Sequence, residues 1–169
     1  MRHFCWSLVL VLQLFVVSCS RRDAFDPRTV ETDAGAALVR QLIADCPHHS
    51  DTRKMCLTLG PDQAPASEAF LGRFPDLKPR FLKHNQVTVL SLNGKTRVLE
   101  KSTGMTTGDL VLLMQVSDMV SAGGKFQAVA AWAYKDDMMR RKYTITPEAD
   151  GKFKVEAGEI IEQKPTPGV

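Results

Sequence analysis

The sequence predicts an α+β domain in which an N-terminal helix and a short second helix pack on a curved antiparallel β-meander of five or six strands. Two observations support this fold class. Before about residue 75, apolar residues recur at three- to four-residue spacing, whereas after Asn85 apolar and polar residues alternate between short turns. Helices followed by consecutive strands are typical of α+β domains.

The first helix is predicted from Val30 to about Asp45. Thr29 or Thr32 can cap its N-terminus, and Pro47 ends it because the residue before a proline is pushed out of the helical region. The apolar positions that form one helical stripe are Val30, Ala34, Ala37, Leu38, Leu42 and Ile43.

A turn followed by a short second helix is expected within Pro61–Phe74. Its apolar residues Ala69, Phe70 and Phe74 are expected to face inward, and Pro75 ends it. An irregular connection then leads to Asn85.

The remaining segments predict strands. Gln86–Leu92 and Lys95–Lys101 flank Asn93-Gly94, the strongest short hairpin signal. Asp109–Val120 is apolar on nearly both faces and should be central. One of its faces carries Leu110, Leu112, Met114, Val116 and Val120, and the other carries Val111, Leu113 and Met119. Three further strands are expected after the turns at Gly123-Gly124, Asp136-Asp137 and Asp150-Gly151.

Composition predicts one domain, spanning residues 30–162, and a disordered C-terminal tail over residues 163–169. The 22 Lys and Arg against 19 Asp and Glu give a net charge of +3, too even to favour nucleic acid, which needs a clustered basic face. We find no Gly-rich phosphate loop and expect no cofactor.

The first residues of the chain have the layout of an export signal. Arg2 is positively charged, Phe4–Val17 is apolar except for Ser7 and Gln13, and the chain turns polar at Ser20. The apolar run is shorter than the about 20 residues that span a membrane.

Val16, Val17, Ser18 and Cys19 resemble the lipobox of bacterial lipoprotein precursors. The resemblance implies that residues 1–18 are a signal peptide, that Cys19 is acylated and anchored in a lipid bilayer, and that residues 19–29 are a flexible tether. It places the protein in the bacterial cell envelope, and Ser20 after the cysteine favours the periplasmic side of the outer membrane over the inner membrane. A secretory signal cut elsewhere and an uncleaved anchor helix remain alternatives.

Cys46 and Cys56 are the only cysteines outside the predicted signal and anchor. An even pair in an oxidising compartment predicts a disulfide between them. The alternative use of these sulfurs is a metal site with His48 and His49, but zinc sites normally use tighter ligand pairs, so no metal is assigned.

The candidate pocket residues are Asp118, Trp132, Tyr134 and Tyr143, with His84 as a further catalytic candidate. A buried Asp118 would be chemically notable because it interrupts an apolar strand, although an exposed carboxylate at a strand end explains it too. The aromatic residues could equally fill the core. No sequence feature pairs these groups for catalysis.

The order of helix, connector and long meander over residues 30–162 is similar to that of cystatin-like and NTF2-like domains. Such folds host enzymes and binding modules alike. We therefore expect an envelope lipoprotein with a non-enzymatic domain that binds a protein partner or a small ligand. The alternative is an NTF2-like small-molecule isomerase or hydrolase with a pocket inside the curved sheet.

Overall fold

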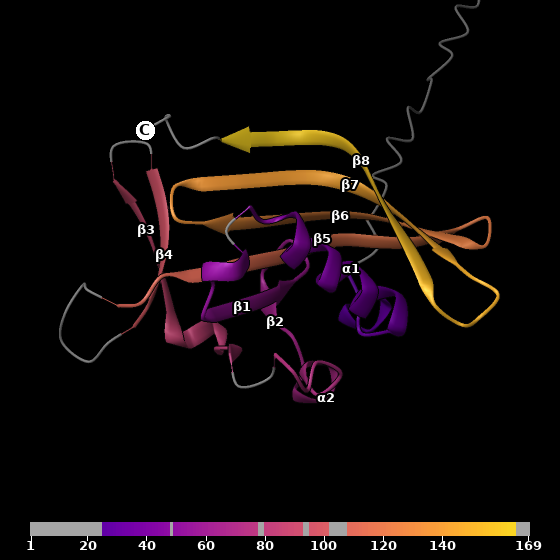
Figure 1. The fold of residues 1–169 in the computed structure, drawn as a ribbon, viewed down its shortest axis with the longest axis horizontal. Helices are drawn as coiled ribbons and strands as arrows, with labels where there is room; N and C mark the ends of the chain where they lie inside the picture. Colours follow the sequence, from indigo (N-terminus) through magenta and orange to yellow (C-terminus); the bar gives the residue numbers. More distant parts are fainter. Residues whose placement is uncertain (1–24, 48, 78–79, 93–94, 102–107, 165–169) are drawn as a thin grey trace, which may run out of the picture.

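Six strands form one mixed sheet, and two others form a separate hairpin, in the computed structural model (Figure 1). The structure describes residues 25–47, 49–77, 80–92, 95–101 and 108–164. The order in the large sheet is β2-β1-β5-β6-β7-β8. Its strands are β1 (Lys54–Leu59), β2 (Ala64–Pro65), β5 (Val111–Ala122), β6 (Lys125–Tyr134), β7 (Asp137–Pro147) and β8 (Phe153–Lys164).

Strands β5 to β8 form the predicted antiparallel meander. Gly123 and Gly124 join β5 to β6 with φ values of 59° and 76°, in the left-handed region that glycine adopts without steric cost. Gly151, with φ of 80°, lies in the turn before β8. The turns foreseen at Gly123-Gly124 and Asp150-Gly151 are thus confirmed, whereas Asn93-Gly94 lies outside the described residues.

The sheet is not wholly antiparallel, however, because β1 pairs with β5 in parallel. β1 is a six-residue strand that is buried from Met55 onward, and nothing in its pattern distinguishes a strand from a piece of buried helix. Parallel neighbours need a long crossover connection. Here the crossover contains β2, the second helix and the β3–β4 hairpin. The second helix and the hairpin were foreseen, whereas β1 and β2 were not.

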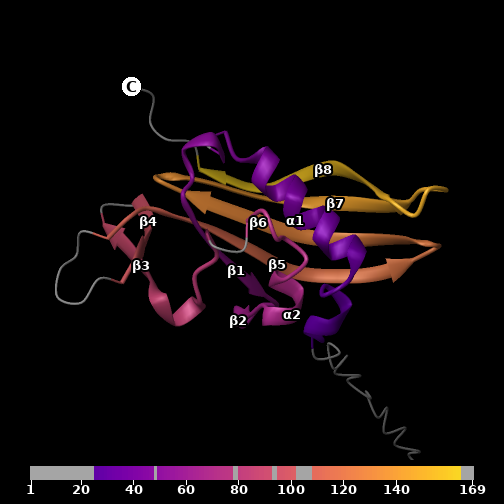
Figure 2. The same cartoon turned by 60° about the horizontal axis from the view of Figure 1, so that its bottom comes forward.

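The first helix, α1 (Asp33–Asp45), runs across one face of the sheet (Figure 2). Its cap is Thr32, whose side-chain oxygen accepts a hydrogen bond from the Gly35 N–H at 3.2 Å, so the helix begins three residues after the predicted start. Cys46 follows it in an extended conformation before Pro47, as expected. The expected packing of a helix on a sheet is therefore confirmed, although this sheet is mixed and not a plain meander.

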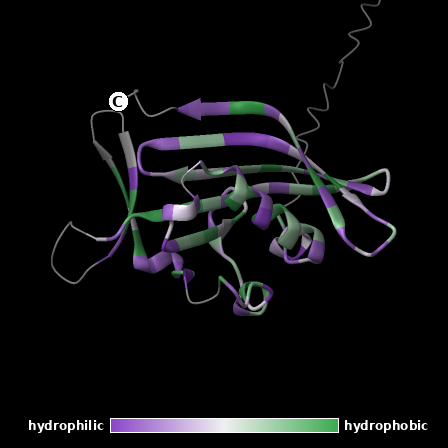
Figure 3. Cartoon of the chain, viewed as in Figure 1, coloured by the Kyte–Doolittle hydropathy of each residue, from purple (hydrophilic) through white to green (hydrophobic). Residues whose placement is uncertain are grey.

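The main core lies between α1 and the sheet and is filled by large side chains. Figure 3 shows hydrophobic residues along β5 and β6 and hydrophilic segments on β7 and β8. The largest fully buried residues are Tyr143, Phe70, Phe74, Leu38, Leu42, Met55, Leu59, Leu112, Met114, Ile145, Val30 and Val39.

The predicted hairpin is confirmed as β3 (Val87–Leu92) and β4 (Lys95–Glu100), but it forms a sheet of its own. It contributes Val87 and Val98 to a second, small core with Cys56 and Val111. The neighbours of these last two residues along their strands belong to the main core. Because successive side chains of a strand point to opposite faces, the small core lies on the sheet face opposite α1.

The second helix, α2 (Glu68–Leu71), is a single turn capped by the Ser67 hydroxyl, which accepts a hydrogen bond from the Phe70 N–H at 3.1 Å. Phe70 and Phe74 are buried as predicted. Ala69 was expected to face inward but is exposed. Phe70 and Leu71, the next two residues of this single turn, pack against the main core, so Ala69 lies on the outer side.

A β-bulge between Val116 and Asp118 changes which residues of β5 face the main core. The sequence alternation placed Val120 with Met114 and Val116, and Met119 on the other face. In the structure Met119 is buried in the main core, whereas Val120 is 51% exposed. The extra residue of the bulge shifts the alternation by one position.

Described elements extend slightly beyond residues 30–162 at both ends. Phe25 packs against the main core and Pro27–Thr29 forms a 3-10 turn, so the folded part begins before residue 30. β8 continues to Lys164 and thereby includes the first two residues of the expected tail. No helix in the described ranges is long and apolar enough to cross a membrane.

Candidate functional site

Two surface clefts have the size of ligand sites, which start at about 300 Å³. The first, here called the α1–β7 cleft, has a volume of about 410 Å³. It is lined by Asp45, Pro47, Trp132, Asp137, Met138, Met139, Gln163 and Lys164. The second, the sheet-edge cleft, has a volume of about 510 Å³ and is lined by Leu57, Pro65, Ala66, Ser67, Glu68, Leu71, Leu82, Lys83, His84 and Asn85.

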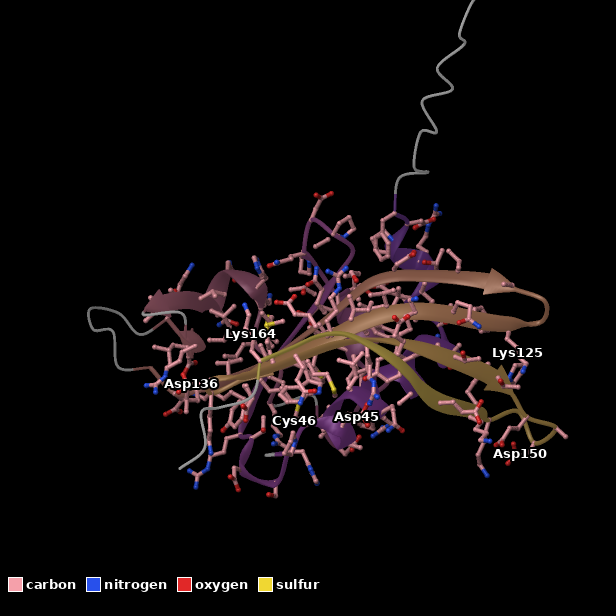
Figure 4. All side chains as sticks on the ribbon, turned by 90° about the horizontal axis from the view of Figure 1, so that it is seen from above. Asp45, Cys46, Lys125, Asp136, Asp150 and Lys164 are labelled. Atoms are coloured by element: carbon pink, nitrogen blue, oxygen red, sulfur yellow. The ribbon has the colours of Figure 1, made fainter. Side chains whose placement is uncertain are left out.

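Asp45, the last residue of α1, is the most connected polar group of the α1–β7 cleft. Its Oδ2 accepts a hydrogen bond from the Tyr143 hydroxyl at 2.8 Å, and its Oδ1 accepts one from Gln41 Nε2 at 2.7 Å. A guanidinium nitrogen of Arg141 lies 3.9 Å from Oδ2. These contacts hold the carboxylate in one orientation at the junction of helix and sheet. Figure 4 labels Asp45 and Cys46 side by side where α1 ends.

Tyr143 acts as a hydrogen-bond donor in this cluster. Burial raises the pKa of its phenol well above the usual range, and the hydrogen bond to Asp45 and the negative charge of that carboxylate raise it further. The phenol therefore keeps its proton at neutral pH. It can position Asp45, but it cannot serve as a base.

Aromatic and thioether side chains form the apolar part of the same cleft. Trp132 is only 5% exposed and pairs with Met139 of β7, whereas Met138, which also lines the cleft, pairs with Ala133. Among the described residues, the indole Nε1–H of Trp132 and the Nε of Arg141 are buried without a hydrogen-bond partner. Buried tryptophan N–H groups usually have an acceptor.

The sheet-edge cleft opens beside β1, between α2 and the 3-10 turn His84–Gln86, and is lined mainly by apolar side chains. Glu31 fixes its Ser67 wall by accepting hydrogen bonds from the Ser67 backbone N–H at 2.6 Å and from the hydroxyl at 2.8 Å. Lys83 and Glu68, both largely exposed, form an ion pair at 3.6 Å. The cleft is an apolar groove with charges at its rim.

The structure disperses the residues that the sequence proposed for a pocket. Trp132 lines the α1–β7 cleft. Tyr143 does not line it but donates a hydrogen bond to Asp45, which does. Tyr134 is buried in the main core, and His84 lies in the sheet-edge cleft. Asp118 is exposed beside the β-bulge, so the buried catalytic aspartate considered from the sequence is absent.

The predicted disulfide between Cys46 and Cys56 does not form in the structure. Cys46 is buried in the main core, whereas Cys56 is buried in the small core on the opposite face of the sheet. Burial raises the pKa of the Cys56 thiol to about 11. Alternation along β1 is the reason for the error, because Met55, one residue before Cys56, takes the position that faces α1.

His48 of the alternative metal site lies outside the described residues, as do Cys19 and the rest of the lipobox segment. Within the described part of the chain, no group of three or more His, Cys, Asp or Glu residues could hold a metal ion.

Sequence reasoning missed Asp45 and Gln41 as site residues, because both were interpreted only as part of a helix end. Their spacing of four residues was a usable signal, since it places two side chains on one helical face.

Comparisons with known protein families, curated proteins and solved structures found no match to this chain.

Proposed function

We propose that this protein is a membrane-anchored lipoprotein of the bacterial envelope whose folded domain binds a small ligand or a protein partner and is not an enzyme. The lipobox-like segment ending in Cys19 carries the anchor proposal. Phe25, a few residues after Cys19, packs against the main core, so the proposed tether is short and holds the domain close to the bilayer.

The position of the clefts favours a binding function over a catalytic one. The region between α1 and the sheet, where an NTF2-like enzyme would have its pocket, is filled by large buried side chains. Among the described residues, the two clefts with the volume of a ligand site lie at the surface. The polar groups of these clefts include positioned donors and acceptors, as in binding sites that orient a ligand.

The enzymatic alternative, an isomerase or hydrolase, would need two titratable groups that face one cleft and exchange protons near neutral pH. Asp45 and Tyr143 are the closest arrangement to this requirement. Because burial keeps Tyr143 protonated, this pair does not supply the two proton-exchanging groups that such a reaction needs. We therefore assign the cluster a positioning role and propose no second function.

The anchor is tested by replacing Cys19 in the full-length protein. Cys19→Ala should move the protein from the membrane fraction to the soluble periplasmic fraction or stop its processing, and mass spectrometry of the wild type should find an acylated N-terminal Cys19. Cys5→Ala is the matched control, because Cys5 lies within the predicted signal and should not affect anchoring. A Cys19→Ala variant that is processed and still bound to membranes would refute the proposal.

A further inference from the structure

Strand β8 forms an open edge of the large sheet, because no described strand lies beyond it (Figure 1). The backbone N–H and C=O groups on an open edge are available to pair with a further strand. From Phe153 to Ala157 the register of β8 with β7 is continuous, whereas it shifts twice between Ala157 and Glu162. Such bulges twist an edge away from pairing, so the regular half, Phe153–Ala157, is the part that can accept another strand.

The hairpin that leads into β8 shows which backbone groups point outward. The Glu148 N–H donates to the Lys152 carbonyl at 2.8 Å, so these two residues form a hydrogen-bonded pair. Such pairs recur at every second residue of an antiparallel ladder, and the register continues unbroken through the regular half. Lys154 and Glu156 therefore bond to β7. The residues whose backbone groups point away from β7, to the free edge, are Phe153, Val155 and Ala157.

The side chains of this half alternate between the two faces of the sheet. Phe153 and Val155 pack against the main core, so they lie on the face that α1 covers. Lys154 and Glu156 lie on the opposite face, with side chains that are 59% and 53% exposed, and form an ion pair at 2.8 Å. A lysine and a glutamate two residues apart give this edge a charge pattern that complements itself when the strand direction is reversed.

These charges select one antiparallel register between β8 and β8 of a second copy. With Val155 opposite Val155 of the second copy, the outward backbone groups face each other and each Lys154 lies opposite a Glu156. The neighbouring registers with compatible hydrogen bonding place two Lys154 or two Glu156 side chains opposite each other, which is destabilising. Charges on an edge normally deter pairing, whereas here they favour a single symmetric arrangement.

We propose that the Phe153–Ala157 edge pairs with the same segment of a second copy of this chain and joins the two large sheets into one. The two-fold axis of an antiparallel pair stands normal to the sheet, so both copies carry α1 on the same face. Phe25 packs against the main core, which lies on that face. Both proposed anchors can therefore reach the same membrane.

The contact between the two edges is short. Stable interfaces bury about 1,200 to 2,000 Å² in total, which is more than the regular half of one strand provides. Confinement of both copies to one bilayer raises their effective concentration, as a linker between two binding modules does. This last step rests on the proposed lipid anchor, whereas the complementarity of the edges does not.

The association is measured on the full-length protein, purified in detergent, by light scattering with absorbance and refractive-index detection, which separates protein mass from detergent mass. A dilution series should show a monomer–dimer equilibrium. Lys154→Glu should weaken the dimer about tenfold or more, because it places carboxylates opposite each other in both symmetry-related pairs. The double variant Lys154→Glu with Glu156→Lys should return the affinity to within about threefold of the wild-type value, because opposite charges face each other again.

Ala157→Pro tests the backbone pairing separately. The Ala157 N–H points to the free edge, so proline removes a hydrogen bond of the dimer and none to β7, and it should abolish association. Circular dichroism and urea unfolding verify that the monomer is folded. Lys101→Glu is the matched control: it reverses an exposed lysine after the β3–β4 hairpin, changes the net charge equally, and should leave the affinity within about twofold of the wild-type value.

A wild-type protein that is monomeric at every concentration up to about 0.5 mM would overturn the second copy as the occupant of this edge. Unchanged affinity of Lys154→Glu, or a double variant that associates no better than Lys154→Glu, would overturn it too. The charge variants decide the question even if Ala157→Pro fails to fold. None of these measurements depends on the fractionation of Cys19→Ala, so failure of the pairing and failure of the anchor proposal are distinguishable.

Discussion

One side-chain hydrogen bond connects the end of α1 to the middle of β7. The Tyr143 hydroxyl, on a side chain that is 1% exposed, donates to Asp45 Oδ2 at 2.8 Å. Hydrogen bonds to charged groups contribute more to stability than neutral ones, and a buried carboxylate that loses a donor is costly. This contact therefore contributes both to the fold and to the geometry of the α1–β7 cleft.

Tyr143→Phe should lower the free energy of unfolding by about 1.5 to 3 kcal/mol, because it removes the donor and leaves Asp45 partly buried. The measurement is urea unfolding followed by circular dichroism. Thr144→Val is the control: the Thr144 hydroxyl donates to Gln127 at 3.2 Å in an exposed position, and its loss should cost less than about 0.5 kcal/mol. Equal stabilities of Tyr143→Phe and the wild type would contradict the assigned role of the contact.

The buried Cys56 thiol predicts a specific dependence of stability on pH. Its folded-state pKa of about 11 lies above the ordinary thiol value of 9.0, because burial disfavours the thiolate. The folded protein thus holds this proton more tightly than the unfolded chain does. The corresponding stability is complete below about pH 9 and is lost as the pH rises from about 9 to about 11.

Cys56→Ala removes this group, so its stability should fall less than that of the wild type between about pH 8 and about pH 10.5. Urea unfolding at the two pH values measures the difference, and other titrating groups cancel because both proteins contain them. Parallel loss of stability in the two proteins would show that Cys56 is not a buried thiol.

At the scale of elements, the end of β1 depends on a glycine. Gly60 follows β1 with φ of 76°, and its N–H donates to the Val116 carbonyl at 2.8 Å. The Gly60 carbonyl accepts a hydrogen bond from Gln115 Nε2 at 2.8 Å. A Cβ at this position would lie 2.5 Å from the Phe25 ring. The ring of Phe25 therefore packs against the backbone at the end of β1.

Gly60→Ala should cost about 2 to 4 kcal/mol, combining the left-handed backbone penalty with the overlap on Phe25. Gly123→Ala separates the two causes, because Gly123 has φ of 59° but nothing within 4 Å of an added Cβ. It should cost only about 1 kcal/mol. Thermal or urea unfolding gives both values, and similar costs for the two variants would rule out the close contact at Phe25.

At the scale of the whole molecule, two cores of unequal size lie on opposite faces of the sheet. The main core joins α1, α2 and the large sheet, whereas the small core attaches the β3–β4 hairpin through a few side chains. Ion pairs of Arg97 with Asp136 and of Lys54 with Glu100 also connect this hairpin. Because these attachments are few compared with the contacts of the large sheet, the hairpin should be the less stable unit.

Native-state hydrogen exchange should therefore show faster exchange for the backbone amides of β3 and β4 than for those of β5 and β6, by local opening of the hairpin. Residues at the centre of β5 and β6 should exchange only through global unfolding, because they lie between two strands of the large sheet. Equal protection of the hairpin and the central strands would indicate that the chain unfolds as one unit. Amide exchange monitored by mass spectrometry after peptide digestion resolves these segments.

The sequence by itself determined the features that depend on neighbouring residues. The cap at Thr32, the stop at Pro47 and the glycine turns act over a few residues, so α1, the β3–β4 hairpin and the order of the meander were foreseen from pattern. Of the residues at the candidate site, the sequence named Trp132 and Tyr143 but not Asp45. The contact of Asp45 with Tyr143 joins a helix end to a strand far along the chain, which no local pattern indicates.

Only the tertiary structure decided the features that depend on partners distant in sequence. The parallel pairing of β1 with β5 requires a crossover whose path no local pattern encodes. That pairing places Cys56 on the face away from α1, which separates it from Cys46. Likewise, the bulge before Asp118 leaves that residue exposed. It also turns Met119 toward the main core and Val120 toward solvent, because one inserted residue reverses the face of every later side chain in a strand.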